Sequence, residues 1–229
     1  DKNPDKGYIN EQLLSFLKES VKKIQFAYNS QIKDNFYSED SIPEYEIKKF
    51  TKQDIKNWAK SNHVKENINN KDDKEFLIEV LAITDRANEL ICHHRMREVQ
   101  IISILLILNS PENRGLFAQI KTGEGKSTIV STLAVIKAMQ LKYVDVLSSS
   151  IVLAKRDAEE KKPFYEVFGL KVSPADDEKA YLANVVYGDT LQFEGDILRD
   201  EFKREPSSSR AKNRRRNFRC LIIDEVDSM

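Results

Sequence analysis

The chain has 229 residues, of which 40% are hydrophobic and 32% are charged. This is enough apolar material for one large domain, or for one domain with an appended helical bundle. Lysine and arginine together number 37, as do aspartate and glutamate, so the formal net charge is zero. A protein-wide basic surface for nucleic acid or for an anionic membrane is therefore excluded, and any such surface would have to be local.

Cysteine usage and the lack of long apolar segments indicate the compartment. Cys92 and Cys220 are far apart and neither belongs to a CxxC pair, which is typical of reduced thiols in an intracellular protein. The polar N-terminus does not resemble a signal peptide. The longest apolar run, Ile101–Leu108, is much shorter than the roughly 20 residues that span a bilayer, and it favours a buried helix under a sheet. We expect a cytoplasmic protein that reaches a membrane only peripherally, through a partner.

The first part of the chain has apolar residues at helical spacing. One such stripe consists of Ile9, Leu13, Leu17, Val21 and Ile24. Thr51 with Asp54 predicts a capping box that opens a short helix carrying Trp58, and Phe76–Leu90 forms another helical stripe. Because no recognisable chemistry lies here, we interpret residues 1–94 as a helical N-terminal region.

From Arg95 onward, apolar strand-like runs alternate with helical stretches. The predicted strands cover residues 115–121, 143–149, 170–173, 184–188 and 221–223. The predicted helices cover residues 125–140, 153–161, 163–169 and 191–202. Such alternation is typical of a parallel sheet with helices on both faces, so we predict an α/β domain over residues 95–229.

The segment Lys121-Thr122-Gly123-Glu124-Gly125-Lys126-Ser127 is the strongest local signal. Phosphate groups need several backbone N–H groups that converge, and glycines with a following helix N-terminus provide them. The predicted nucleotide-binding residues are Thr122, Gly123, Glu124, Gly125, Lys126 and Ser127, with Lys126 on the β- and γ-phosphates and Ser127 on Mg²⁺. Ile120 stands where the common pattern has a further glycine. The alternative is a glycine-rich turn with an incidental lysine.

An acidic pair follows the last apolar run. Leu221–Ile223 precedes Asp224 and Glu225, so a buried central strand would deliver both carboxylates to the carboxyl edge of the sheet, where open α/β folds bind ligands. Asp224 would hold Mg²⁺ through water, and Glu225 would orient or deprotonate the attacking water. By itself the pair could be an exposed strand end; together with the phosphate loop it predicts an ATP–Mg²⁺ site.

Five segments, in order, resemble the SecA preprotein translocase ATPases. They are Arg95–Gln100, Lys121–Ser127, the LAKRDAE run Leu153–Glu159, the run from Tyr187 to Asp200, and Asp224–Ser228. The resemblance extends from about Phe76 to Met229, and it departs from the family at Glu98 and Asp189. It implies a RecA-like P-loop fold, here an incomplete first motor lobe, and it assigns Gln100 to adenine recognition. Without the resemblance, Gln100 would be an ordinary polar helix residue.

The resemblance also implies a motor ATPase that couples ATP hydrolysis to protein transport. Its partners would be ATP, an unfolded polypeptide or preprotein bound through other domains, and a membrane channel. The sequence ends at Met229, before the second lobe that would supply an arginine to the γ-phosphate. We therefore expect this stretch to hydrolyse ATP slowly or not at all by itself. Arg156 and Asp157 are expected to support the site or to couple it to that lobe.

Two other functions fit parts of the pattern. Asp224–Asp227 also matches the DExD box of nucleic-acid helicases, and residues 203–217 form a basic stretch that could contact phosphates. No aromatic residues are interleaved with that stretch, so a solvated loop and no nucleic-acid partner are expected. The second alternative is a non-catalytic nucleotide-binding module. Cys92-His93-His94 lacks a second ligand cluster and is interpreted as structural.

Overall fold

The structure is a computed structural model of the chain that describes residues 11–29, 46–70, 73–110, 115–177, 179–202 and 219–226. The first half is helical, with α1 (Glu11–Asn29), η2 (Ile47–Lys49), α2 (Lys52–Lys60), α3 (Asn62–Asn67), α4 (Lys74–Cys92) and α5 (Glu98–Leu108). The second half alternates, with α6 (Lys126–Leu141), β1 (Val144–Leu147), α7 (Ile151–Val167), β2 (Val172–Pro174), η3 (Ala180–Leu182), β3 (Val185–Gly188), α8 (Thr190–Phe202) and β4 (Leu221–Ile223).

The four strands form one parallel sheet in the order β2-β3-β1-β4. Strand β1 is central: its Val146 is in register with Tyr187 of β3 and with Ile222 of β4. All four residues of β1 and of β3 are buried, as expected for parallel strands with helices on both faces. The predicted fold class is therefore confirmed: a parallel α/β sheet preceded by helices, as in a RecA-like domain.

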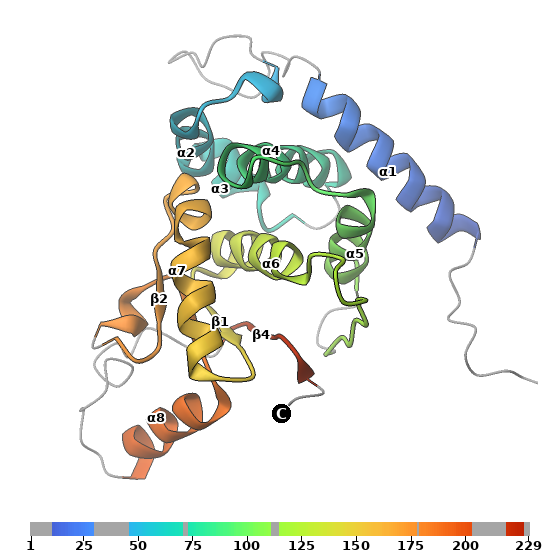
Figure 1. Cartoon of the computed structure of the whole chain (residues 1–229). Coiled ribbons are helices and arrows are strands. Elements are labelled where there is room, and N and C mark those ends of the chain that lie inside the picture. Colours follow the sequence, from blue (N-terminus) through green and yellow to red (C-terminus); the bar gives the residue numbers. More distant parts are fainter. Residues whose placement is uncertain are drawn as a thin grey trace, which may run out of the picture.

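The two faces of the sheet pack against different helices, because successive strand side chains point to opposite sides. Val144 and Val146 of β1 belong to the main core, together with α6 and α7. Leu147 belongs to a smaller core with Tyr181 and Phe193, contributed by η3 and α8. In Figure 1, α6 lies above the strands and α8 below them.

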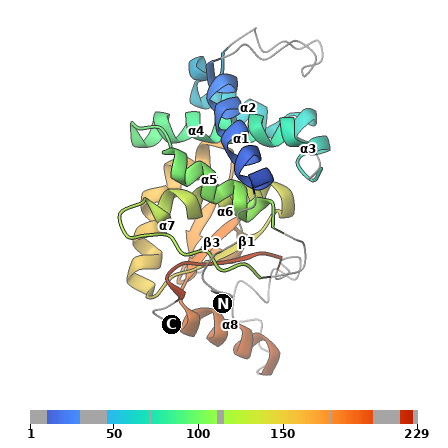
Figure 2. The same ribbon diagram turned by 90° about the vertical axis from the view of Figure 1, so that its right-hand side faces the viewer.

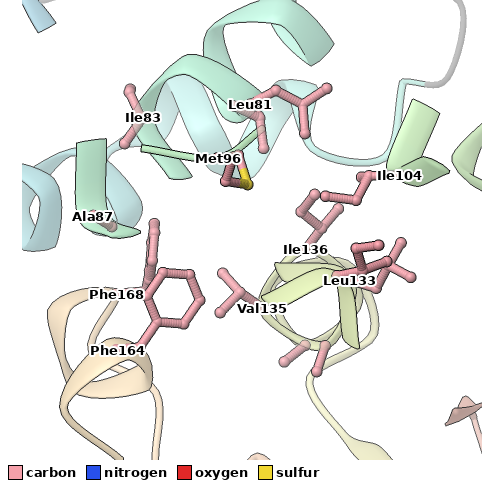
Figure 3. Close-up of a cluster of buried hydrophobic side chains, with 14 of the residues drawn as sticks. Leu81, Ile83, Ala87, Met96, Ile104, Leu133, Val135, Ile136, Phe164 and Phe168 are labelled. Atoms are coloured by element: carbon pink, nitrogen blue, oxygen red, sulfur yellow. The ribbon is translucent and has the colours of Figure 1, made fainter. Parts of the chain in front are cut away.

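The main core joins the N-terminal helices to the α/β part. Figure 3 shows Leu81 and Ala87 of α4 facing Val135 of α6 and Phe164 of α7. Figure 2 shows α1, α4 and α5 stacked on the side of α6 that faces away from the strands. Residues on both sides of the predicted boundary at 94/95 thus share one apolar cluster. Whether residues 1–94 form a separate unit stays a prediction.

Local contacts mark the ends of several helices, and the predicted capping box is one of them. Thr51 and Asp54 form the capping box of α2: the Asp54 carboxylate accepts from the Thr51 N–H at 2.8 Å, and the Thr51 hydroxyl accepts from the Asp54 N–H at 3.3 Å. Asp73 caps α4 by accepting from the Phe76 N–H at 2.9 Å. Helix α4 ends at His93, which has a left-handed backbone with φ of 61°.

Three expectations about local structure are wrong. Residues 115–121 form no strand, and Phe117 is 86% exposed. A strand requires a neighbouring strand for its N–H and C=O groups. In the described sheet, β4 is the edge strand and pairs with β1, and residues 115–121 do not pair with its outer side. The two helices predicted on either side of Pro163 are one helix, α7, because Phe164 and Tyr165 are buried beyond the proline and their packing offsets the lost backbone hydrogen bond.

The third concerns the apolar run Ile101–Leu108. It is a helix, and Ile101, Ile104 and Leu105 are buried, but α5 packs mainly against α6 and α1 instead of lying directly under the sheet. In the described part of the chain, the helices are all too short or too polar to cross a bilayer. The basic stretch at residues 203–217 lies outside the described residues.

Candidate functional site

The acidic pair lies at the carboxyl edge of the sheet, as predicted, but the strand before it is not the buried central strand that was expected. Strand β4 is at the edge of the sheet, where only β1 covers it in the described residues, and Leu221 and Ile223 are exposed. Leu147 at the end of β1 is in register with Ile223 at the end of β4, and the Asp224 N–H donates to the Leu147 carbonyl at 2.8 Å. The chain then turns sharply at Glu225, whose φ is 61°. The Ser149 hydroxyl, two residues beyond the end of β1, donates to Glu225 Oε2 at 2.8 Å and so orients the second carboxylate.

The phosphate loop enters α6 through two glycines. Gly123 has φ of 84° and Gly125 has φ of 76°, a backbone region that glycine adopts without steric cost. Gly125 is the N-cap and Lys126 the first residue of a helix of 16 residues. The first N–H groups of such a helix have no carbonyl partner inside it, and its N-terminal end carries partial positive charge. This end of α6 suits an anion.

The structure brings the loop and the acidic pair together. Lys126 Nζ lies 3.7 Å from Asp224 Oδ1, although the two residues are far apart in the sequence. This proximity is the geometric condition for a triphosphate and its metal to fit between them.

A pocket lies next to this ion pair. It is lined by Ser127, Val130, Val146, Ser148, Asp157, Lys161, Tyr187 and Asp224. Ser127 and Asp224, the two predicted Mg²⁺ ligands, therefore border the same space. Sequence reasoning did not anticipate Lys161 or Tyr187 here. The spacing of Asp157 and Lys161, four apart on α7, could have placed Lys161 on the same helix face as Asp157.

Asp224 is an incompletely neutralised carboxylate. Burial raises its pKa, and the nearby Glu225 and Asp157 carboxylates raise it further, while Lys126 opposes them. Both solvent removal and like charges disfavour the ionised form, so a single lysine does not balance the site. An additional cation beside Asp224 would lower the electrostatic energy of the carboxylate.

The residues present fit a magnesium ion bound together with a nucleotide. Asp224 Oδ1 is buried and, among the described residues, has no hydrogen-bond partner. A buried acceptor of this kind is costly unless a ligand, ion or water satisfies it. No group of three or more His, Cys, Asp and Glu residues in the described ranges could hold a metal by itself. Mg²⁺ typically uses one or two protein oxygens, phosphate oxygens and waters, so Asp224 and the Ser127 hydroxyl would suffice.

Gln100 holds the phosphate loop in this structure. Its Nε2 donates to the carbonyls of Glu124 at 3.0 Å and of Gly125 at 3.3 Å, and its Oε1 accepts from the Arg97 N–H at 2.9 Å. The residue is 3% exposed. Both ends of the amide are thus engaged with protein groups. Adenine recognition by Gln100 stays a prediction, and it would require the amide to exchange these partners for the base.

A pair of buried tyrosines lies beside the pocket. The hydroxyls of Tyr165 on α7 and Tyr187 on β3 are 2.7 Å apart, and either can be the donor. Burial raises the pKa of both hydroxyls, so both are neutral at physiological pH. The pair fixes α7, which carries Asp157, against the strand that borders the pocket.

A parallel α/β sheet, a glycine-rich loop capping a helix, and an acidic pair at a strand end are together typical of nucleotide-binding α/β folds. Comparison with protein families narrows this class. The model of the SecA DEAD-like domain matches residues 15–229. The chain belongs to this family, and the resemblance inferred from its motifs is confirmed.

Individual relatives agree with this assignment. Protein translocase subunit SecA of Acinetobacter baumannii is 33% identical over 180 residues, which are 75% of this chain and 19% of the relative. The subunit of Campylobacter fetus is 35% identical over 163 residues, 68% of this chain and 18% of the relative. That of Ehrlichia canis is 28% identical over 218 residues, 90% of this chain and 24% of the relative. The chain thus spans about a fifth of the length of these relatives.

Proposed function

We propose that the chain is the ATP–Mg²⁺-binding part of a SecA-type motor ATPase. One observation carries the proposal: Lys126 at the N-terminus of α6 and Asp224 at the end of β4 lie 3.7 Å apart, beside a pocket that Ser127 also borders. An anion-binding helix end and a metal-binding carboxylate are needed at this separation to hold a triphosphate with its metal.

Each residue has a definite task in this proposal. The Lys126 ammonium neutralises the β- and γ-phosphates, and the loop residues Thr122–Gly125 surround them with backbone N–H groups. Ser127 and Asp224 hold Mg²⁺, which supplies charge neutralisation at the phosphates when bound. Glu225, oriented by Ser149, accepts a proton from the attacking water or positions it. Gln100 recognises the adenine.

The wider activity follows from family membership. The relatives are named as translocase subunits. We propose that the intact protein couples ATP hydrolysis to the movement of a preprotein, through parts that lie beyond the matched region, and that it works in the cytoplasm at a membrane channel.

Calorimetric titration of ATP–Mg²⁺ tests the proposal. Wild type is expected to bind, and Lys126→Ala and Asp224→Asn are each expected to weaken binding by at least about 30-fold, because each removes a charged contact worth ~2 kcal/mol or more. Glu225→Gln is expected to bind ATP–Mg²⁺ within about 3-fold of wild type, because that carboxylate acts on water and not on the phosphates.

Lys155→Ala provides the matched control. Lys155 is an exposed lysine on α7 that pairs with Asp176 at 3.2 Å and does not border the pocket. This variant is expected to bind like wild type. Equal affinity of wild type, Lys126→Ala and Asp224→Asn would show that the loop and the acidic pair do not form a nucleotide site.

A further inference from the structure

Two side chains at the N-terminus of α5 donate hydrogen bonds to consecutive backbone carbonyls of the phosphate loop. Arg97 Nη2 donates to the Gly123 carbonyl at 2.9 Å. Gln100 Nε2 donates to the next two carbonyls, of Glu124 and Gly125, at 3.0 and 3.3 Å. Three peptide units in a row are therefore held from the side of α5.

Holding the carbonyls also directs the N–H groups. In a trans peptide the C=O and the following N–H point in opposite directions, and the described residues contain no cis peptide bond. The N–H groups of Glu124, Gly125 and Lys126 therefore face away from α5. That of Glu124 closes the loop by donating to the Lys121 carbonyl at 3.1 Å. Those of Gly125 and Lys126 face the side where an anion would approach.

Arg97 has a second contact in the loop. Its Nη1 lies 3.1 Å from Glu124 Oε2. A glutamate in the middle of a phosphate loop places negative charge beside the negative charge of the ligand, which is unfavourable at short range. The Arg97 guanidinium pairs with this charge through Nη1 while its Nη2 binds the adjacent carbonyl, and its planar fork of donors suits both contacts at once.

We propose that Arg97 is a positioning residue of the phosphate loop and that Glu124 is its ionic anchor. Through this pair, α5 aims the N–H groups of Gly125 and Lys126 at the phosphates and cancels the charge of Glu124. The effect on ligand affinity rests on the proposed nucleotide binding. The effect on the loop itself does not, because the contacts exist without any ligand.

Hydrogen exchange without nucleotide tests the loop directly. In Arg97→Ala, the Glu124 amide, which donates to the Lys121 carbonyl, is expected to exchange about 10-fold faster than in wild type, because the loop loses a charge-assisted hydrogen bond of ~1.4 kcal/mol. The core amides of α6 and the melting temperature are expected to change little. Lys155→Ala, which removes another exposed ion pair, is expected to leave the loop amides unchanged. Unchanged loop exchange in Arg97→Ala would overturn the proposal.

A double-mutant cycle tests the charge pairing with ATP–Mg²⁺ as the ligand. Arg97→Ala is expected to weaken binding about 10-fold in wild type, but only about 3-fold or less in a Glu124→Gln background, because no unpaired charge then remains in the loop. Arg97→Lys is expected to be intermediate, since it keeps the charge but not the planar fork.

The two tests separate the two proposals. Additive effects of Arg97→Ala and Glu124→Gln on affinity would refute the charge pairing while nucleotide binding stands. If wild type does not bind ATP–Mg²⁺, the proposed function fails, and the exchange measurement still decides whether Arg97 positions the loop.

Discussion

At the scale of single residues, Gly125 shows how closely the loop and α5 fit. A methyl group on its Cα would lie 2.2 Å from Gln100 Nε2, a distance at which something must move. Gly123 has a similar positive φ, but no atom lies within 4 Å of the corresponding position. The two glycines therefore have different requirements: Gly123 needs the backbone conformation alone, and Gly125 also needs the space.

This difference predicts unequal effects of two chemically identical substitutions. Gly123→Ala is expected to weaken ATP–Mg²⁺ binding about 5-fold, from ~1 kcal/mol of backbone strain. Gly125→Ala is expected to weaken it at least about 30-fold, because the added methyl also displaces the Gln100 amide from two carbonyls. Titration calorimetry on both variants measures the ratio. Equal losses would mean that the contact between Gln100 and the loop does not matter for binding.

At the scale of elements, the pocket depends on how α7 is fixed to β3. Tyr165 is fully buried and Tyr187 is 3% exposed, and their hydroxyls hydrogen-bond to each other. The rings also pack edge to face, with centroids 6.3 Å apart. A polar contact between two buried hydroxyls adds little net stability when complete, but loss of one partner leaves the other without its bond.

Removal of one hydroxyl is therefore predicted to lower the free energy of unfolding by more than half of the loss caused by removing both. Tyr165→Phe and Tyr187→Phe are each expected to lower the free energy of unfolding by about 1–2 kcal/mol. The double variant is expected to lose clearly less than the sum, because no unsatisfied hydroxyl remains. Urea denaturation of the four proteins measures this coupling. A loss in the double variant that equals or exceeds the sum of the single losses would contradict this coupling.

At the scale of the whole molecule, the N-terminal helices are joined to the segment that leads into α5. Asp85 of α4 is completely buried and accepts from Arg95 Nε at 2.8 Å and from the Met96 N–H at 2.6 Å. The Arg95 guanidinium also lies 3.6 Å from the ring centroid of Tyr28 on α1. These contacts position the chain just before Arg97 and Gln100. Helices α1 and α4 therefore stabilise the two side chains that bind the phosphate loop.

The buried carboxyl predicts a dependence of stability on pH. Burial raises the pKa of Asp85 above its usual value of 3.8, against the opposing effect of its donors. A raised folded-state pKa contributes stability while the carboxyl is protonated, and this contribution is lost as pH rises through that pKa. The free energy of unfolding of wild type relative to Asp85→Asn, which cannot titrate, is therefore expected to fall as pH increases from about 4. Urea denaturation across this range tests the sign. A relative stability of wild type that rises with pH would mean that Arg95 outweighs burial.

Most of the fold, and the two motifs of the candidate site, could be predicted because they depend on short-range patterns. The capping box at Thr51, the strand before Asp224 and the glycine turn before Lys126 each need only a few neighbouring residues of the right type. The expected burial of that strand was wrong, because burial depends on the strand's place in the sheet, and β4 is at the edge with Leu221 and Ile223 exposed. The parallel sheet followed from the alternation of such segments. The expected strand at residues 115–121 failed for the opposite reason: its pattern was local, but a strand exists only beside another strand.

The sequence by itself determined the class of fold, the family, and the two motifs that can hold phosphate and metal, because these are encoded in residue type and spacing. Only the tertiary structure decided that Lys126 meets Asp224, that α7 continues through Pro163, and that Arg97 and Gln100 grip the loop. The contacts of Lys126 and of Arg97 and Gln100 join segments that are distant along the chain, and the continuous α7 depends on the burial of side chains beyond Pro163. In each case packing and burial outweigh local preference.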